Sequence, residues 1–294
     1  MKYRVTHVTQ YFYGELVPLC HNLVRLRPRD TAWQTCLSHD LAVEPMPAGR
    51  RERIDFFGNH VTWVALQQAH KGLKIRACSE VDVNERPAAG DAPSMAWDEV
   101  PNWLASRLDA DSLEARQFTF DSPHVPRDRQ LADYARTSFP AGAPLFKCLV
   151  EFNERINKEF TFDSTATTVS TPVLDVLSRR RGVCQDFAHL AIGCLRSLGL
   201  PARYVSGYVA TKPPPGKPRL AGADASHAWI SVFIPQRGWV DFDPTNALIP
   251  SGGHVTIAFA RDYGDVSPVK GVMIGGDWHS LSYSVDVEPY GPRV

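Results

Sequence analysis

Hydrophobic and polar residues alternate over most of the first third of the chain. Runs with this period of two residues cover 3–13, 23–26, 37–43, 54–57, 60–66 and 73–83. Such a period places successive side chains on opposite faces of an extended segment, so these runs predict half-buried β-strands. Gly58-Asn59, between two of the runs, is typical of a hairpin turn. We expect residues 1–86 to form an antiparallel β-sandwich.

The periodicity changes after a stretch rich in proline, glycine and alanine at 86–93. Beyond it, apolar residues recur at helical spacing over 128–137, 143–160 and 172–178. Strand-like runs return after Pro201 and continue to the C-terminus. The sequence therefore predicts an α+β protein with a β-rich N-terminal domain at 1–86, a linker at 87–100 and a second domain at 101–294.

One predicted helix of the second domain begins with a cysteine. Apolar residues from Phe187 to Leu198 follow Cys184 at helical spacing, and Gly199 with Pro201 ends the helix. Cys184 thus lies in the first turn, where unpaired N–H groups and the helix dipole favour an anion. This position favours the thiolate, which is the nucleophilic form of cysteine. The same N–H groups could bind the oxyanion formed by attack on a carbonyl.

The other five cysteines lack such a context, and we interpret them as small apolar side chains: Cys20, Cys36, Cys78, Cys148 and Cys194. No C-x-x-C pair is present, which disfavours a zinc ribbon or a disulfide scaffold. We therefore expect a reducing, cytoplasmic location, which would also keep Cys184 free.

Two predicted strands downstream supply a base and a carboxylate. His227 lies in an alternating run at 225–235, between two small residues that leave room for another side chain. In the next strand, alternation places Asp241 and Asp243 on one face. We prefer Asp243 as the partner of His227 because Pro244 ends the strand there, and Asp241 is the alternative. Thiol, imidazole and carboxylate are the parts of a nucleophile-base-orienter relay.

These motifs resemble the bacterial transglutaminase-like superfamily, and the segments that carry the resemblance are 181–189, 199–208, 226–229 and 238–245. The similarity is closest over residues 150–265, and Arg261-Asp262-Tyr263 fits a distal motif of the family. The front of the chain resembles the β-rich region that accompanies this domain in bacteria. The resemblance implies a papain-like cysteine enzyme core. In it, Cys184 would be the nucleophile, His227 the general base and acid, and Asp243 the orienter.

The relay and the resemblance together predict acyl transfer through a thioester on peptide or protein amide substrates. We expect hydrolysis, as in a peptidase or amidase, and transfer to a primary amine is the alternative. A second alternative is a non-catalytic peptide-binding module, which replacement of Cys184, His227 or Asp243 would have favoured. All three are present. No calcium-loop pattern appears, so we expect no calcium control and no metal or other cofactor.

Charge and hydropathy add little to the choice of partners. The 32 basic and 32 acidic residues cancel, so no strong field would attract nucleic acid or a membrane surface. No apolar run is long enough to span a bilayer, and the first residues lack the apolar core of a signal peptide. The expected partner is the peptide substrate alone, and the sequence makes no prediction of oligomeric state.

Overall fold

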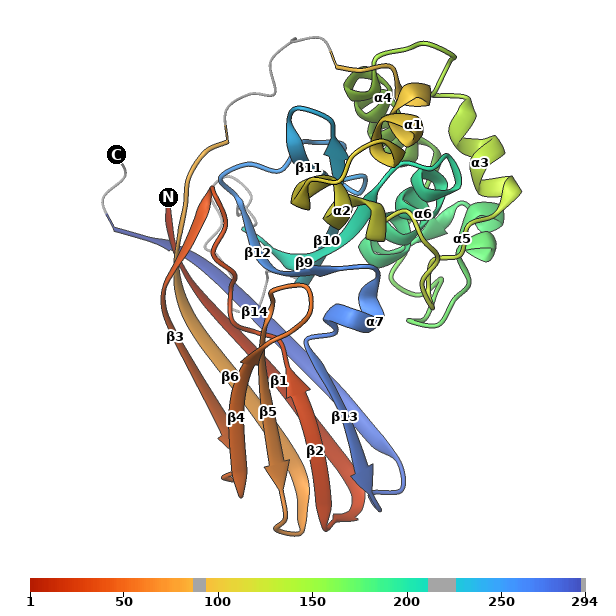
Figure 1. Ribbon diagram of the computed structural model, residues 1–294. Helices are drawn as coiled ribbons and strands as arrows, with labels where there is room; N and C mark the ends of the chain where they lie inside the picture. The colour runs from red at the N-terminus through yellow and green to blue at the C-terminus, as the bar shows by residue number, and fades with distance from the viewer. Residues whose placement is uncertain (87–93, 211–225, 292–294) are drawn as a thin grey trace, which may run out of the picture.

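The computed structural model describes residues 1–86, 94–210 and 226–291. It has mixed α/β architecture, with antiparallel sheets in one part and a helix-covered sheet in the other (Figure 1). The part with the antiparallel sheets has eight strands and is called the β unit below. Its strands are β1 (Lys2–Val17), β2 (Leu19–Val24), β3 (Gln34–Glu44), β4 (Gly49–Ile54), β5 (His60–Leu66), β6 (His70–Val83), β13 (Val269–Ile274) and β14 (His279–Tyr290).

The β unit consists of two four-stranded sheets that share one hydrophobic core. Their strand orders are β14-β1-β6-β3 and β13-β2-β5-β4. Alternate residues of β6 are buried, as the two-residue period predicts, and Leu73 and Ile75 meet Val64 and Leu66 from the other sheet. The antiparallel architecture expected for the front of the chain is confirmed.

The last two strands differ from the expected domain boundary, which placed all residues from 101 to 294 together. β14 instead pairs with β1 from Lys2↔Tyr290 to Tyr13↔His279, and β13 pairs with β2. Without these partners β1 and β2 would be edge strands with unpaired backbone groups. Local periodicity predicts a strand but does not name its pairing partner, which here lies more than 240 residues away in the sequence.

The expected linker at 87–100 lies only partly within the described residues. Residues 87–93 lie outside the described ranges, and a 3₁₀ turn at Trp97–Glu99 leads directly into α1 (Val100–Ala105). Further helices are α2 (Ala110–Gln117), α3 (Arg129–Arg136), α4 (Leu145–Glu159), α5 (Val173–Arg179), α6 (Cys184–Ser197) and α7 (Tyr263–Val266). A two-stranded parallel pair, β7 (Thr161–Phe162) with β8 (Arg181–Gly182), precedes α6.

The second part is built around α6 and one antiparallel sheet. The sheet has the order β11-β10-β9-β12, formed by Gly238–Phe242, Ser226–Ile234, Ala202–Val209 and His254–Ala260. Every residue of α6 from Asp186 to Arg196 is buried, since the sheet packs on one side and α3 and α5 pack on another (Figure 1). This burial fixes the start of α6 relative to the sheet.

Two amide side chains of the β unit join it to β12, the edge strand of that sheet. Gln34 donates from Nε2 to the carbonyl of Thr256 and accepts from its N–H, both at 2.8 Å. Asn59 makes the same pair of bonds with Phe259, both at 3.0 Å. Each amide therefore satisfies one donor and one acceptor of an edge that would otherwise be unpaired.

Asn59 ends the turn between β4 and β5, which is longer than the two residues expected. The N–H of Asp55 donates to the Asn59 carbonyl at 2.9 Å, so the turn spans five residues. Gly58 within it has φ 76°, a left-handed conformation that favours glycine. The turn thereby presents the Asn59 amide to β12.

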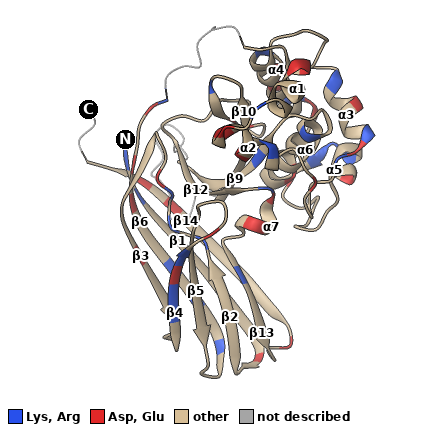
Figure 2. Ribbon diagram, viewed as in Figure 1, with Lys and Arg blue, Asp and Glu red and all other residues tan. Residues whose placement is uncertain are grey.

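Acidic and basic residues are interspersed over the helices and along β4 (Figure 2). Among the described residues, no helix is both long and apolar enough to cross a membrane.

Candidate active site

A buried carboxylate fixes the start of α6. Asp186 accepts a hydrogen bond from the Val183 N–H at 2.8 Å and another from the Thr167 hydroxyl at 2.6 Å, both at Oδ2. A Cβ on Gly182 would lie 2.6 Å from the same oxygen. Only glycine therefore leaves room for Asp186 to reach back over the helix start. Cys184 is the first helical residue and is half-buried, as the sequence predicted for its position.

His227, near the start of β10, is in contact with both other members of the predicted relay. Its Nε2 lies 2.8 Å from Oδ2 of Asp243. Burial disfavours the imidazolium, but hydrogen bonds with Asp243 and with the Cys184 side chain outweigh it and raise the pKa of His227 to about 10. A thiolate at Cys184 and the carboxylate of Asp243 therefore both stabilise a protonated imidazole.

Asp243, immediately after β11, is fully buried and accepts hydrogen bonds at both oxygens. Oδ1 accepts from the backbone N–H groups of Thr245 at 3.0 Å and Asn246 at 3.2 Å. Oδ2 accepts from His227 and from Asn246 Nδ2 at 2.7 Å. Burial raises the pKa of Asp243, yet the hydrogen bonds, led by that of His227, hold it well below its usual range. The carboxylate is thus kept ionised.

Asp241, the alternative carboxylate, lies on the same strand but serves another partner. Its Oδ2 accepts from Trp229 Nε1 at 3.1 Å and forms an ion pair with Arg86 at 2.8 Å. The Trp229 ring stacks on His227 with 6.0 Å between centroids and 27° between planes. Asp241 therefore orients the aromatic neighbour of the imidazole, whereas Asp243 contacts the imidazole itself.

The sequence reasoning missed His254. This residue, the first of β12, is buried and places Nε2 at 3.1 Å from Asp243 Oδ2. In the sequence, His254 stands out only as a polar residue at the start of an apolar run that predicts a strand. The ligand atoms of His227, Asp243 and His254 lie within 4.8 Å of one another, a set that could hold a metal ion. In this structure the two imidazoles instead donate to the carboxylate between them.

His189, a buried residue of α6, has a structural role. Its Nε2 accepts the backbone N–H of Tyr263 at 3.1 Å, and its ring stacks on His124. Burial lowers the pKa of His189 to about 3. Asp262 completes this region by accepting the N–H of His124 at 3.0 Å and capping α7. The distal motif at 261–263 thus fixes the chain around α6.

Two family models match this chain. The model for the bacterial transglutaminase-like N-terminal region matches residues 3–82, and the model for the transglutaminase-like superfamily matches residues 134–244. An uncharacterised protein of Mycobacterium tuberculosis is 39% identical to this chain, over 98% of this chain and 93% of its own length. The chain belongs to the transglutaminase-like superfamily and carries the bacterial N-terminal region, which confirms the resemblance seen in its motifs.

Two further similarities extend this result. A solved structure of a candidate cysteine protease from Cytophaga hutchinsonii has a TM-score of 0.77 at 22% identity, covering 100% of this chain and 92% of that chain. The two proteins share a fold. The protein-glutamine gamma-glutamyltransferase of Pseudomonas aeruginosa is 32% identical over 54% of this chain, and the match spans 26% of that protein's length. The family and the fold together support a thiol-dependent enzyme.

Proposed function

We propose that this protein hydrolyses peptide or protein amide bonds through a thioester on Cys184. The observation that carries the proposal is the contact of one imidazole with both a half-buried thiol at a helix start and an ionised, buried carboxylate. In this assignment Cys184 is the nucleophile, His227 transfers protons and Asp243 orients the imidazole. Such an arrangement performs acyl transfer in unrelated folds.

The steps follow from the charges of the site. The Cys184 thiolate attacks the amide carbonyl carbon, and the backbone N–H groups of the first turn of α6 stabilise the oxyanion. The His227 imidazolium gives its proton to the leaving nitrogen as the C–N bond breaks, which leaves a thioester. Neutral His227 then takes a proton from water as the water oxygen attacks, and the C–S bond breaks to release the acid and the thiolate.

Transfer of the acyl group to a primary amine is the second candidate. The first half of the reaction is the same, and the amine replaces water in the second half. The Pseudomonas aeruginosa relative bears the name of such an enzyme. Hydrolysis is the outcome that we favour, since Cys184 is only half-buried and water can reach the thioester.

The test is incubation with a glutamine-containing peptide library in the presence and absence of a primary amine. Hydrolysis of backbone amides gives shorter peptides, whereas transfer gives peptides whose mass increases by that of the amine less ammonia. Mass spectrometry separates the two outcomes, and Cys184→Ala serves as the inactive control. Cys78→Ala, at a half-buried cysteine of β6, controls for cysteine loss elsewhere. If neither water nor the amine gives a product, the result contradicts catalysis and favours a non-catalytic peptide-binding module.

The compartment and partners remain part of this proposal. All six cysteines are free thiols. A reducing cytoplasm suits a protein that depends on a free Cys184. The proposed partner is the peptide substrate, without nucleic acid or membrane.

A further inference from the structure

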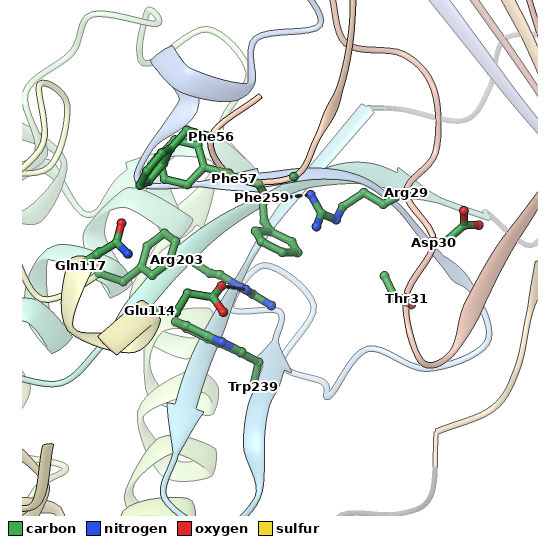
Figure 3. Close-up of a pocket in the computed structure, with 12 residues that line it drawn as sticks. Arg29, Asp30, Thr31, Phe56, Phe57, Glu114, Gln117, Arg203, Trp239 and Phe259 are labelled. Carbon is green, nitrogen blue, oxygen red and sulfur yellow. Dashed lines mark hydrogen bonds and ion pairs between the residues drawn. The ribbon is translucent and has the colours of Figure 1, made fainter. Parts of the chain in front are cut away.

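A cavity of about 680 Å³ is lined by residues of the β unit, of α2 and of the second sheet (Figure 3). Arg203 and Trp239, near the starts of β9 and β11, form its floor, and the turn at 56–58 contributes to its wall. Along β9, Arg203 is four residues from Gly207, the pairing partner of His227. At about 3.3 Å per residue, the backbone of Arg203 is on the order of 13 Å from that of Gly207, the residue opposite His227. Cavities of this size accommodate ligands.

Two arginines and two aromatic rings alternate along the floor of this cavity. The Arg29 guanidinium carbon is 3.8 Å from the centroid of Phe259, and that of Arg203 is 3.5 Å from the same centroid. Arg203 also lies over Trp239 at 4.0 Å. Figure 3 shows the two guanidinium groups reaching the cavity from different elements, with Phe259 between them. The rings hold both groups in place and offer their faces to the cations.

The hydrogen-bonding capacity of these arginines is incompletely used. Arg203 is 8% exposed, its Nε has no partner among the described residues, and its ion pair with Glu114 is long, at 3.5 Å. Burial lowers the pKa of Arg203 to about 9. The Nε of Arg29 is likewise without a partner in the described ranges, while its Nη1 donates to the Phe57 carbonyl at 3.0 Å and to Asn59 Oδ1 at 2.6 Å. A buried guanidinium with unfilled donors is costly, and a carboxylate is the ligand that matches its geometry.

The nearby acids do not fill this role. Glu114 makes only the long contact with Arg203, and its side chain is 47% exposed. Asp30 accepts a hydrogen bond from the backbone N–H of Cys36 at 2.8 Å. The stack therefore retains unused N–H donors in a largely buried position.

A second cavity of about 410 Å³ lies beside the first. Phe56, Phe57 and Gln117 line both cavities, and the second extends to Phe120. Phe56 is 78% exposed and Phe120 is 59% exposed. Large aromatic side chains are thus exposed at both neighbouring cavities, and exposed apolar surface of this kind marks interaction sites. A peptide can contact these rings with apolar side chains, whereas a single ion cannot.

We propose that these two neighbouring cavities bind a peptide segment that carries a carboxylate. Arg203 and Arg29 hold the carboxylate, and apolar side chains of the peptide contact Phe56 and Phe120. A C-terminal carboxylate and the side chain of an aspartate or glutamate share this chemistry, and the experiment below separates them. The proposal goes beyond the amide hydrolysis assigned above, because binding here does not require the thiol.

The test uses the full chain with Cys184→Ala, so that no peptide is turned over. Isothermal titration calorimetry compares three pentapeptides of alanine and phenylalanine: one with a free C-terminal carboxylate, its C-terminal amide, and the amide with a central aspartate. The proposal predicts that at least one carboxylate peptide binds about tenfold or more tightly than the plain amide. Tighter binding of the first identifies a chain terminus as the ligand, and tighter binding of the third identifies an acidic side chain.

Two variants locate the binding. Arg203→Gln removes the charge and should abolish the preference for carboxylate peptides. Because Arg203 is buried and its loss could unfold the chain, Phe56→Ser provides an independent test at an exposed position and should weaken binding several-fold. Phe12→Ser, at a 47% exposed phenylalanine of β1, is the matched control and should leave binding unchanged. Equal affinity for acid and amide, no binding of any peptide, or unchanged binding by Phe56→Ser overturns the proposal.

Discussion

His254 Nε2 lies 3.1 Å from Asp243 Oδ2, the same oxygen that accepts the hydrogen bond from the relay imidazole. The carboxylate is therefore held from two sides by histidines on different strands. Because a carboxylate with fewer donors is free to rotate, His254→Phe should misorient the imidazole and lower kcat by about tenfold to a hundredfold, with KM little changed. Steady-state kinetics of the His254→Phe variant, the Asp243→Asn variant and the variant with both substitutions check this. Additive effects of the two substitutions would contradict a shared role.

Gly182 is required by the close approach of Asp186. Gly182→Ala should push the carboxylate off the Val183 N–H and destabilise the protein by about 1–3 kcal/mol. Gly253→Ala is the matched control, because nothing lies within 4 Å of a Cβ there and its φ is ordinary. Urea unfolding of both variants measures the difference. Equal unfolding free energies would show that the helix start tolerates a side chain at 182.

The His227–Asp243 pair should make the free energy of unfolding depend on pH. The folded pKa of His227, about 10, is above the ordinary 6.5, so this contribution is full below about pH 6.5 and is lost as the pH rises towards 10. The lowered pKa of Asp243 gives stability that is full above about pH 4 and is lost in more acidic solution. The unfolding free energy of wild type minus that of His227→Gln should therefore be largest near pH 4–6.5. A difference that grows from pH 7 to 10 would contradict the raised pKa.

Cys184 should react with iodoacetamide near neutral pH much faster than the other five cysteines. Cys184 is half-buried at a helix start beside His227, whereas burial raises the pKa of Cys20, Cys148 and Cys194. Peptide mapping after brief labelling identifies the modified residue. His227→Ala should slow the labelling of Cys184, with Cys36 as the internal reference. Labelling of Cys36 and Cys184 at equal rates would argue against an activated thiol.

The local parts of the site could be predicted from the sequence because each rests on one segment. Helical spacing placed Cys184 at a helix start, alternation placed His227 on a strand, and Pro244 favoured Asp243 as the residue at the strand end. The structure brings the three together, while their catalytic roles remain a prediction. The fold class and family were predicted correctly, since several motifs of the superfamily occur in order.

Features that join distant segments were out of reach of such reasoning. His254 meets Asp243 only because β12 lies across the sheet, and β14 completes a sheet begun by β1. The Gln34 amide that pairs with β12 looks like any polar residue of a strand in the sequence. These contacts depend on strand order and register, which the local hydrophobic pattern does not specify.

Trapping of the acyl-enzyme tests the central assignment most directly. Wild type, Cys184→Ala, His227→Ala and Asp243→Asn would be mixed with an activated ester of a short peptide, and intact masses recorded within seconds. We expect the acyl adduct in wild type, none in Cys184→Ala or His227→Ala, and slow accumulation in Asp243→Asn because the imidazole is misoriented. An adduct that persists in Cys184→Ala would place the nucleophile on another residue and contradict the account.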